Sequence, residues 1–581
     1  MARFPTIEER KMKPTELIEL TPLGGLGEFG KNCMLLKTAD TRILIDCGGM
    51  FPDAEHPGVD LIVPDFRQLD GVFLDALVLT HGHEDHIAGV PHLLSYLVEK
   101  KRAPIKVYGT PFTLALVTRK LEEFNLLSAA DLIPCKAGKV FHIKGISVEP
   151  IHVNHSIPDS VALAIRTPSG LVYHSGDWRI DHTPVNEPRI DLQRIAEIGR
   201  EGVYILLADS TNSDVPGSSV SEARVGVEFE DVMDLAPGRV LVTQFSSNIG
   251  RLQSIVSAAT ETGRRVALIG RALRRNASVA RETGHLELVD PRVLMSLEDV
   301  VKLPDHEVVI VVAGSQGEPF SSLTRIAAGE HPEVRIKTGD WVVYSSRKIP
   351  GNEKRISYVV DQLIERGAKV LTPGVKVLHT TGHALADEQK LLLNLLRPRF
   401  FVPAHGSYRQ LDAHRRLGEE LELETHVFTV GETLTFVNDK VSRTALQNVE
   451  PIYVVEQRRD VVDEEILRQR RQIAAGGFVI VTLLKTHAGK LAEVLVLPYG
   501  VCIKAASLVA EAKEKAREAV VAVGHGDDVT QCEAARLAVR RFFKLHSERK
   551  PFVIVEVSRI PAARAGKTLE KSEKIEDSQA S

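Results

Sequence analysis

The sequence predicts an α/β protein in three parts: a sandwich of strands and helices, a second α/β unit inserted into it, and an α+β unit at the C-terminal end. Polar and histidine-containing loops follow a series of short apolar runs, as at a site built along one sheet edge. From about residue 221 the pattern changes to helices alternating with strands, which is typical of a parallel sheet. After about residue 375, apolar runs that end in a histidine return, so the first unit resumes there.

The first part, residues 1–220, contains apolar runs separated by glycine-rich or polar breaks, the usual signal for short strands. A run rich in leucine and valine, 74–80, ends at a histidine-rich loop, and a helical pattern follows over 86–100. The other strands expected here cover 18–22, 34–37, 42–46, 105–108, 147–151, 161–166, 171–174 and 204–208.

The expected limits of the later parts are 221–374 for the insert, 375–450 for the rest of the sandwich, 451–465 for a linker, 466–560 for the third unit and 561–581 for a polar, disordered tail. In the insert we expect strands at 240–243, 265–268 and 307–312 and a helix at 251–262. The resumed sandwich has expected strands at 375–379 and 400–403. The third unit has expected helices at 463–472, 508–521 and 533–545 and strands at 476–484 and 551–557.

Composition places limits on function. The chain has 581 residues, a net charge of −4 and 5% aromatic residues. A protein that attracts nucleic acid over its whole surface is normally basic, so any RNA must be held in a local groove or through metal ions. No apolar run is long enough for a membrane span, no secretory signal precedes the first part, and the five cysteines form no CxxC pair. We therefore expect a cytoplasmic protein without disulfides or a thiolate zinc site.

The hexapeptide HGHEDH at 81–86 is the most informative segment. It comes straight after an expected strand, so His81 and His83 can face one ion while Asp85 and His86 face a neighbouring one. Imidazole and carboxylate ligands without thiolate suit zinc, and manganese less well. A solvated histidine-rich loop is the alternative, but four ligand-type side chains at a strand end favour a metal site.

Further candidate ligands follow other expected strands: His155 in VNHSIPDS, Asp177 in HSGDWRID and His405 in VPAHGS. Each alone is more often a surface residue, but with the hexapeptide they make a seven-residue set for two zinc ions. Asp46, in LIDCGG, is expected to orient histidine N–H groups rather than bind metal directly. The remaining neighbouring histidines are interpreted as structural or surface residues: His92, His152, His174 and His182.

Two zinc ions can activate water at neutral pH and stabilise both the attacking and the leaving oxygen of an in-line displacement. This suits hydrolysis of a phosphodiester, and equally of a lactone, thioester or β-lactam. The metal site alone therefore does not select the substrate.

Ten segments decide between these substrates: GGLGEFGKNC (24–33), HGHEDHIAG (81–89), HSIPDS (155–160), SGDWRID (175–181), DSTN (209–212), SSNIGRLQ (246–253), GSQGEP (314–319), SSRKIPGNE (345–353), HTTGHA (379–384) and VPAHGSYR (402–409). In content, order and spacing they resemble the bacterial ribonuclease J family. The resemblance implies a metallo-β-lactamase αββα sandwich, a β-CASP domain at 221–374 that closes over the metal site to form an RNA channel, and a C-terminal α+β domain.

The resemblance also implies a zinc-dependent ribonuclease, with two Zn²⁺ per chain, that cuts RNA internally and degrades it 5′ to 3′ in RNA maturation and decay. It implies a preference for 5′-monophosphorylated RNA, a homodimer or homotetramer, and a possible place in an RNA-degradation complex. Asp85 and His383 would be catalytic, His383 stabilising the leaving oxygen or the scissile phosphate.

Small polar loops in and after the insert have backbone N–H groups and hydroxyls suited to phosphate. The substrate-binding residues expected there are Ser246, Asn248, Arg251, Gly314, Ser315, Gln316, His379, Thr380, Thr381, Gly382, His383 and Ala384. Thr381 stands where the family has a serine, and its methyl group would alter the terminal-phosphate pocket. A cluster of arginines either lines the RNA path or forms a solvated helix face: Arg271, Arg274, Arg275 and Arg281.

The sequence suggests four alternative functions. GxGxxG at 25–30 is typical of dinucleotide binding only if a helix opens at the third glycine, whereas the following residues predict strands. A small-molecule hydrolase would not need the insert. A DNA-processing nuclease would use the same chemistry, and competition between RNA and DNA would separate the two. A non-catalytic RNA-binding subunit is disfavoured because all seven ligands are present.

Overall fold

The computed structural model describes residues 17–560 apart from positions 54, 350, 447–448, 456–459, 502–505, 525–526 and 548. The expected tail at 561–581 lies outside the described residues. The chain divides into two compact units, the first formed by Met1–Met50 with Ile62–Pro451 and the second by Phe51–Leu61 with Ile452–Ser581. Over the described ranges, no helix has both the length and the apolar character to cross a membrane.

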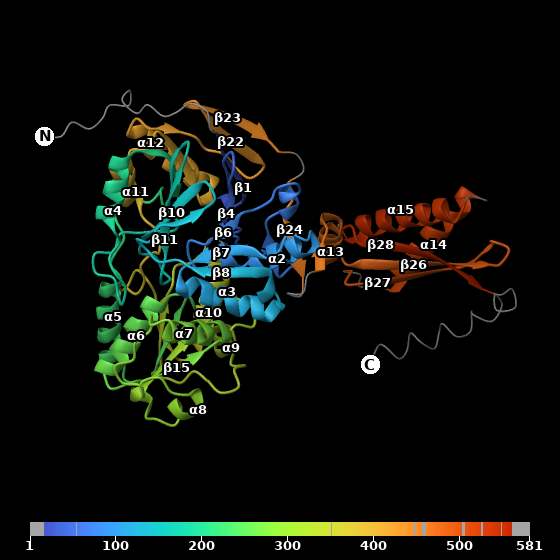
Figure 1. Ribbon diagram of the computed structural model, residues 1–581. Coiled ribbons are helices and arrows are strands. Elements are labelled where there is room, and N and C mark those ends of the chain that lie inside the picture. Colours follow the sequence, from blue (N-terminus) through green and yellow to red (C-terminus); the bar gives the residue numbers. More distant parts are fainter. Residues whose placement is uncertain are drawn as a thin grey trace. The chain divides into compact units, whose positions relative to one another are not determined.

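Two sheets pack face to face in the first unit (Figure 1). The larger has the order β23-β22-β1-β3-β4-β6-β7-β8 and the smaller β21-β19-β13-β12-β11-β10-β9. The strands of the larger sheet are β1 (Ile18–Gly24), β3 (Cys33–Lys37), β4 (Arg42–Ile45), β6 (Ala76–Val78), β7 (Ile105–Gly109), β8 (Ala130–Pro134), β22 (Glu432–Val437) and β23 (Lys440–Ala445). Those of the smaller are β9 (Phe141–Ile143), β10 (Ile146–His152), β11 (Val161–Thr167), β12 (Gly170–His174), β13 (Val203–Asp209), β19 (Phe400–Ala404) and β21 (Glu424–Thr425).

The core between these sheets contains apolar side chains from both of them. Helices α4 (Leu192–Glu201), α11 (Ala386–Leu396) and α12 (Tyr408–Glu420) pack on the outer face of the smaller sheet. Helices α2 (Val90–Glu99) and α3 (Pro111–Phe124) lie along β7 and β8 of the larger one (Figure 1). Strand β13 is buried at every position, because both of its faces are covered. The predicted αββα sandwich is confirmed.

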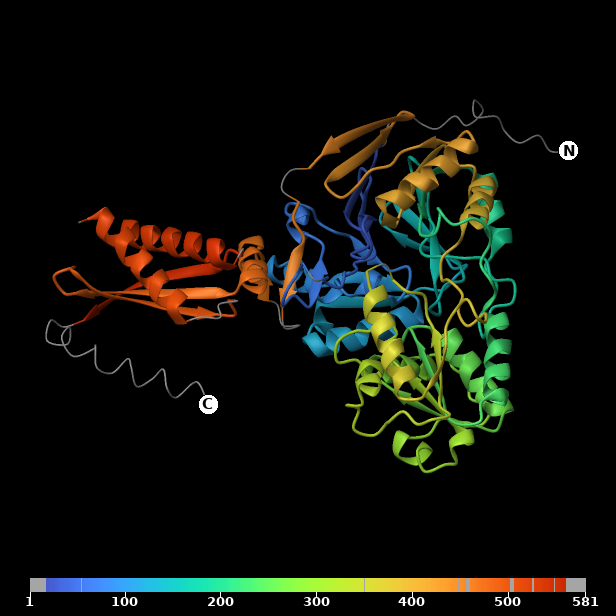
Figure 2. The same cartoon turned by 180° about the vertical axis from the view of Figure 1, so that it is seen from behind.

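The insert is a five-stranded parallel sheet in the order β15-β16-β14-β17-β18. Its strands are β14 (Val240–Gln244), β15 (Arg265–Ile269), β16 (Val308–Val312), β17 (Trp341–Ser345) and β18 (Lys369–Leu371). Helices α9 (Ser322–Ala328) and α10 (Glu353–Glu365) share a core with one face, and α10 is the yellow helix nearest the viewer in Figure 2. The other helices of the insert are α5 (Glu222–Leu235), α6 (Ile249–Glu261), α7 (Arg271–Glu282) and α8 (Leu297–Val300).

Two sequence expectations in this unit have a clear outcome. The expected strand at 375–379 is wrong, since this segment is a loop whose Leu378 carbonyl accepts a hydrogen bond from Ser345 Oγ (2.7 Å) instead of joining a sheet. After the GxGxxG segment the chain enters strand β3 and not a helix, while β2 (Leu26–Gly27) pairs with β20 (Gly406–Ser407). The geometry needed for a dinucleotide fold is therefore missing.

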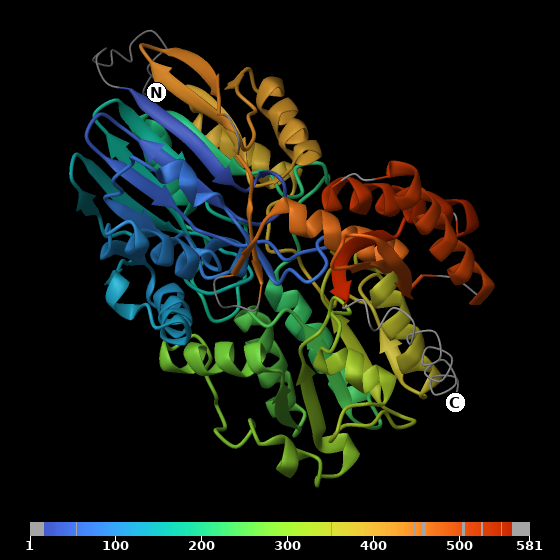
Figure 3. The same cartoon turned by 90° about the vertical axis from the view of Figure 1, so that its right-hand side faces the viewer.

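The second unit contains β26 (Phe478–Thr486), β27 (Leu491–Tyr499) and β28 (Phe552–Ile560), with α14 (Ala506–Val523) and α15 (Asp528–Ser547) on one face (Figures 1 and 3). Burial alternates along β26, as expected for a sheet covered on one side. The segment expected as a linker, 451–465, has regular structure: β24 (Ile452–Val455) pairs with β25 (Asp460–Val462), and α13 (Glu464–Gly476) begins within it.

Candidate metal centre

The seven expected ligands lie at one edge of the sandwich, beyond the ends of several strands. The hexapeptide 81–86 follows β6 and enters the short helix α1 (Glu84–Ile87), while His155 follows β10, Asp177 follows β12 and His405 follows β19. Strand β4 is parallel to β6, and β12, β13 and β19 are parallel neighbours. Because the carboxyl ends of parallel strands share one edge of a sheet, these loops meet.

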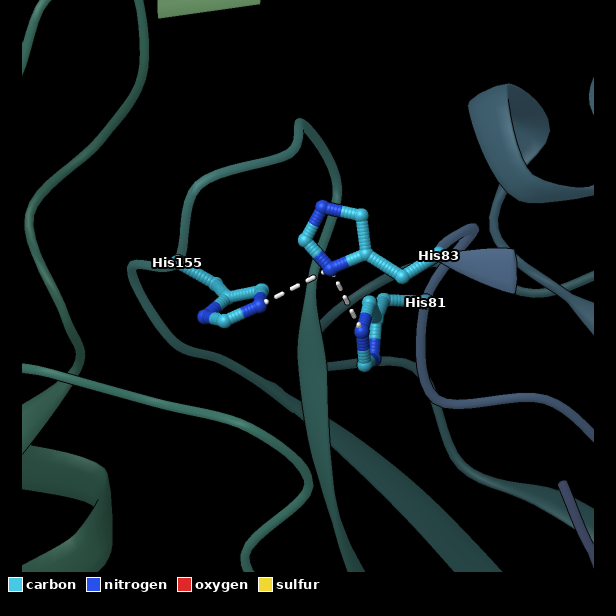
Figure 4. A group of neighbouring side chains, drawn as sticks. All are labelled: His81, His83 and His155. Atoms are coloured by element: carbon cyan, nitrogen blue, oxygen red, sulfur yellow. Dashed lines mark hydrogen bonds between the residues drawn. The ribbon is translucent and has the colours of Figure 1, made fainter. Parts of the chain in front are cut away.

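Three imidazoles from this edge converge (Figure 4). His83 Nδ1 lies 3.2 Å from His81 Nε2 and 3.0 Å from His155 Nε2. Two ligands of one tetrahedral zinc ion at ~2.0–2.1 Å from the metal would be separated by about 3.3 Å. The three nitrogens are therefore spaced as one face of a tetrahedral zinc site.

A second group lies beside the first and consists of Asp85, His86, Asp177 and His405. Asp85 Oδ2 lies 3.6 Å from His86 Nε2 and 3.4 Å from His405 Nε2. Asp177 Oδ2 is 3.2 Å from His86 Nε2 and also 3.7 Å from both His81 Nε2 and His155 Nε2. One carboxylate oxygen thus faces both groups, which is the position a bridging ligand needs.

Asp46 holds residues of the hexapeptide loop by hydrogen bonds. It follows β4 with a φ of 61°, and its two carboxylate oxygens accept hydrogen bonds from Thr80 N–H and Thr80 Oγ, each at 2.8 Å. The same carboxylate lies 2.8 Å from His86 Nδ1, while Thr80 Oγ lies 3.0 Å from His81 Nδ1. Asp46 thus contacts His86 directly and His81 through Thr80, each at Nδ1, and leaves both Nε2 atoms available to bind a metal.

Sequence reasoning missed Asp209, the last residue of β13. Its carboxylate oxygens lie 2.7 Å from His383 Nδ1 and 3.2 Å from His405 Nδ1. The only signal was its place in the DSTN segment at the end of an expected strand. His383 itself lies beside the zinc-ligand candidates, its ring 4.9 Å from that of His155 and 5.4 Å from that of His405.

The protonation states match metal binding directly in the first group only. Burial lowers the pKa of His81 and His155 well below the usual 6.5 and that of His83 to about 4, so these imidazoles are neutral, the form that binds zinc. In the second group, burial would lower the pKa of His86 and His405, but the charge of Asp177 raises it well above the usual 6.5, so a metal ion would displace a proton from each. Burial alone would raise the pKa of Asp177, but the charges of His405 and His86 hold it well below its usual range. Asp177 is therefore an ionised ligand.

The donor set fits zinc by its chemistry. The seven expected ligands are five imidazoles and two carboxylates, with no cysteine, and among the described residues a third group, Asp177, Asp209, His383 and His405, overlaps them. Imidazole and carboxylate ligands in two adjacent groups match sites in which zinc retains an open position for substrate. His81, His83 and His155 would hold one ion and Asp85, His86 and His405 the other, with Asp177 between them.

Comparison with known proteins assigns the chain to a family. The family "Ribonuclease J, beta-CASP domain" matches residues 237–363 and "Ribonuclease J C-terminal domain" matches 465–560. The "Beta-lactamase superfamily domain" matches 41–191 and the "Zn-dependent metallo-hydrolase RNA specificity domain" matches 370–429. The chain is 39% identical to ribonuclease J of Thermus thermophilus over 87% of its own length and 89% of that protein. The chain belongs to the ribonuclease J family.

Other relatives agree. Ribonuclease J of Synechocystis is 38% identical over 83% of this chain and 75% of that protein. A crystal structure of a protein of unknown function from Enterococcus faecalis aligns with 72% of this chain and all of that chain, with a TM-score of 0.52 and 17% identity. That likeness shows the fold alone. As a member of the ribonuclease J family, the chain is a metal-dependent hydrolase with a β-CASP insert.

The β-CASP histidine loop, residues 379–384, lies against the metal centre. The Gly382 carbonyl is 2.5 Å from His155 Nδ1, so this loop orients a zinc-ligand candidate. Thr381 Oγ accepts hydrogen bonds from His383 N–H (3.1 Å) and from Asn212 Nδ2 (3.0 Å). Thr380 Oγ instead donates to the Val220 carbonyl at 2.5 Å, so of these two threonines it is Thr381 whose hydroxyl bonds to His383.

Arg251 does not reach a substrate. It is fully buried, pairs with Glu222, and donates from its guanidinium to Ser345 Oγ at 2.5 Å. Its expected contact with RNA is therefore replaced by a structural role inside the β-CASP domain of this ribonuclease J family member. Asn248 is also buried, and its side chain accepts from the Arg251 N–H (2.8 Å) as the N-cap of α6. Ser246, in the preceding turn, remains partly exposed.

The GSQGE loop is buried from Gly314 to Gln316, and its glutamine is fully engaged. Gln316 Nε2 donates to the Arg347 carbonyl at 2.8 Å, and its Oε1 accepts from Ile349 N–H at 2.9 Å. The Gln316 side chain, which was expected to bind phosphate, therefore holds the neighbouring loop at 346–349 by two hydrogen bonds. Arg347, which sequence reasoning did not single out although it lies in a family segment, is exposed beside it.

Of the four arginines on α7, Arg271, Arg274 and Arg281 are exposed, whereas Arg275 is part-buried and forms ion pairs. Arg275 lies 3.7 Å from both Glu84 and Glu123 of the sandwich. It joins the β-CASP domain to the hexapeptide loop, next to the ion pair between Lys120 and Glu84 (2.6 Å).

Proposed function

We propose that this chain is a two-zinc ribonuclease that hydrolyses RNA phosphodiester bonds both internally and from the 5′ end. The single observation that carries this proposal is the position of Asp177 Oδ2, within 3.8 Å of ring nitrogens from both ligand groups. The comparison with ribonuclease J proteins supports RNA as the substrate. Two bound zinc ions would supply activation of water and stabilisation of charge on the reacting oxygens.

Two residues of the chain, Asp85 and His383, would have catalytic roles. Asp85 would complete the second ligand group, beside Asn32, whose Nδ2 donates to its carboxylate at 3.3 Å. His383 would give a proton to the leaving oxygen. Burial lowers the pKa of His383, but the adjacent Asp209 charge and hydrogen bond raise it above the usual 6.5, so the imidazole holds a proton near neutral pH. With Nδ1 bound by Asp209, Nε2 is the atom left to face substrate.

A preference for 5′-monophosphorylated RNA rests on the histidine loop. Thr381 supplies a hydroxyl that bonds to His383 N–H, and the backbone N–H groups of Thr381 and Gly382 would be further donors to a phosphate. Thr381 carries one methyl group more than the serine typical of the family, so we expect it to alter the terminal-phosphate site, and the preference among 5′ ends tests this loop. Maturation and decay of RNA are the roles that match this activity.

We also propose, from membership of the family, that the chain forms an oligomer and is located in the cytoplasm. Apolar side chains are half exposed on the sheet face of the second unit that lies away from α14 and α15, namely Leu497, Tyr499 and Ile554. Such a surface favours a homodimer or homotetramer, and an RNA-degradation complex would use other surfaces. The four described cysteines are free, which fits a reducing cytoplasm.

The test uses purified protein, with zinc measured by elemental analysis, and one RNA sequence carrying a 5′-monophosphate, 5′-triphosphate or 5′-hydroxyl, labelled at each end in turn. We expect two zinc ions per chain, mononucleotides released from the monophosphate RNA, and slower internal cleavage of all three. The His83→Ala variant should lose both zinc and cleavage. Zinc-loaded protein that cuts no RNA, or that prefers single-stranded DNA in competition, would refute the proposal.

A further inference from the structure

One cationic side chain beside the histidine loop has no assigned role. Arg347 follows β17 by two residues, is exposed, and donates a hydrogen bond from its guanidinium to Asn212 Oδ1. We propose that Arg347 binds a phosphate group of the RNA next to the metal centre. This inference rests on the proposed ribonuclease function and assigns that function a residue that contacts substrate.

The side chain of Arg347 is held in place through Asn212. Asn212 is buried, has a φ of 62°, and its Nδ2 donates to Thr381 Oγ at 3.0 Å and to the His383 carbonyl at 3.4 Å. These two bonds fix the amide so that its oxygen faces Arg347. The guanidinium is therefore one side chain away from the loop that carries the proposed proton donor.

The backbone of Arg347 is held as well. The buried Gln316 donates from Nε2 to the Arg347 carbonyl and accepts at Oε1 from Ile349 N–H, so it holds the main chain directly after the Arg347 Cα. Two buried amides thus fix both the main chain and the side chain of an exposed arginine. Holding a cation in place before binding reduces the entropy lost when it binds an anion.

The charge of Arg347 is uncompensated, unlike the charges of Arg179 and Arg251. Arg179 pairs with Asp181 at 2.7 Å, and Arg251 pairs with Glu222. In the part of the chain that the structure describes, no carboxylate forms an ion pair with Arg347, whose one hydrogen-bond partner is a neutral amide. An arginine with free donors and no acid partner, beside a site that acts on phosphodiesters, is suited to bind phosphate.

The competing explanation is that Arg347 only links the β-CASP domain to the sandwich through Asn212. The Arg347→Gln variant removes the charge and, with a side chain two bonds shorter, also the donor to Asn212, so its RNA binding reports the phosphate contact and its unfolding midpoint reports the structural link. Arg347→Lys retains the charge and loses the planar guanidinium. Arg292→Gln is the matched control, since Arg292 is 83% exposed, pairs with Asp290 and lies in the insert outside the loops described above.

Binding is measured on zinc-loaded protein by fluorescence anisotropy at several salt concentrations. The probes are two phosphorothioate RNAs of one sequence that resist cleavage, one with a 5′-monophosphate and one with a 5′-hydroxyl. We expect Arg347→Gln to weaken binding about tenfold and to reduce the slope of log K against log salt by about 0.7, the value for one phosphate contact on a single strand. Arg347→Lys should recover part of both, and Arg292→Gln should change neither.

A smaller slope with both RNAs would assign Arg347 to an internal phosphate, and a smaller slope with the 5′-monophosphate RNA alone would assign it to the terminal one. Either result supports the inference. Unchanged binding and slope in Arg347→Gln would overturn it, and a lower unfolding midpoint in that variant would then identify a structural link. Failure of the wild-type protein to cleave RNA would instead count against the proposed function, because this test measures binding.

Discussion

Replacing Gly382 by alanine should weaken zinc binding, although Gly382 is not itself a candidate ligand. A Cβ atom at this position would lie 2.6 Å from Ser156 Oγ and 2.9 and 3.0 Å from His155 Cε1 and Nδ1. Contacts of this kind normally lie at about 3.5 Å, so the imidazole would have to move by about 0.5 Å. The ring is also held by the 2.5 Å contact between His155 Nδ1 and the Gly382 carbonyl.

That movement is large for a metal ligand. Zinc–nitrogen distances tolerate changes of only about 0.2 Å, and changes to residues that orient ligands typically weaken metal binding about 10- to 100-fold. We therefore expect Gly382→Ala to weaken binding of zinc at the His81, His83 and His155 group by about that factor, with a parallel loss of cleavage. Competition with a chromophoric chelator measures the affinity, and elemental analysis after dialysis measures the zinc retained.

Two further variants make this reasoning refutable. Gly145→Ala is the control, since its new Cβ would meet only Thr41 Oγ at 3.7 Å, an ordinary contact. Adding Ser156→Gly to Gly382→Ala removes the shortest contact and leaves the one with the ring, so affinity should recover only in part. Wild-type zinc affinity in Gly382→Ala, or full recovery in the double variant, would show that the ring of His155 is not what the new methyl group displaces.

The other predictions concern protons. His383→Ala should retain zinc and lose most turnover. Asp209→Asn should lower the pKa of His383, so the alkaline limit of the pH–rate profile should move to lower pH. An unmoved limit would mean that another group donates the proton. His414 is buried with a pKa lowered to about 3 by burial, so below pH 6.5 the unfolded chain takes up a proton that the folded one excludes. Between pH 6.5 and 5 this costs about 2 kcal/mol of stability, and urea unfolding of His414→Leu at both pH values should show that much less dependence than wild type.

The convergence of the candidate ligands could be predicted because the place of each depends on a local pattern. HGHEDH after an apolar run, and His155, Asp177 and His405 after others, needed only the rule that parallel strands end at one edge. The parallel sheet of the insert followed in the same way from its alternation of helices and strands. The family segments then selected RNA among the substrates that two zinc ions allow.

What escaped prediction depends on contacts between residues far apart in the sequence. Asp209 looks like an ordinary turn residue until His383 and His405, each more than 170 positions away, meet its two oxygens. Arg251 follows a polar loop as a substrate ligand would, but Glu222 and Ser345 enclose it. The apolar residues at 375–379 resemble a strand, yet the Leu378 carbonyl is taken by a serine hydroxyl.

The order of the ligands along the chain has a consequence during synthesis. Asp85 and His405, which belong to one ligand group, are separated by 320 positions, with the whole β-CASP domain between them. A ribosome must therefore translate the insert and return to the sandwich before the last ligand emerges. Until then the growing chain lacks part of the candidate centre, and we expect it to be unable to cleave the messenger RNA being translated. Prematurely terminated chains that end before His405 would be inactive for the same reason.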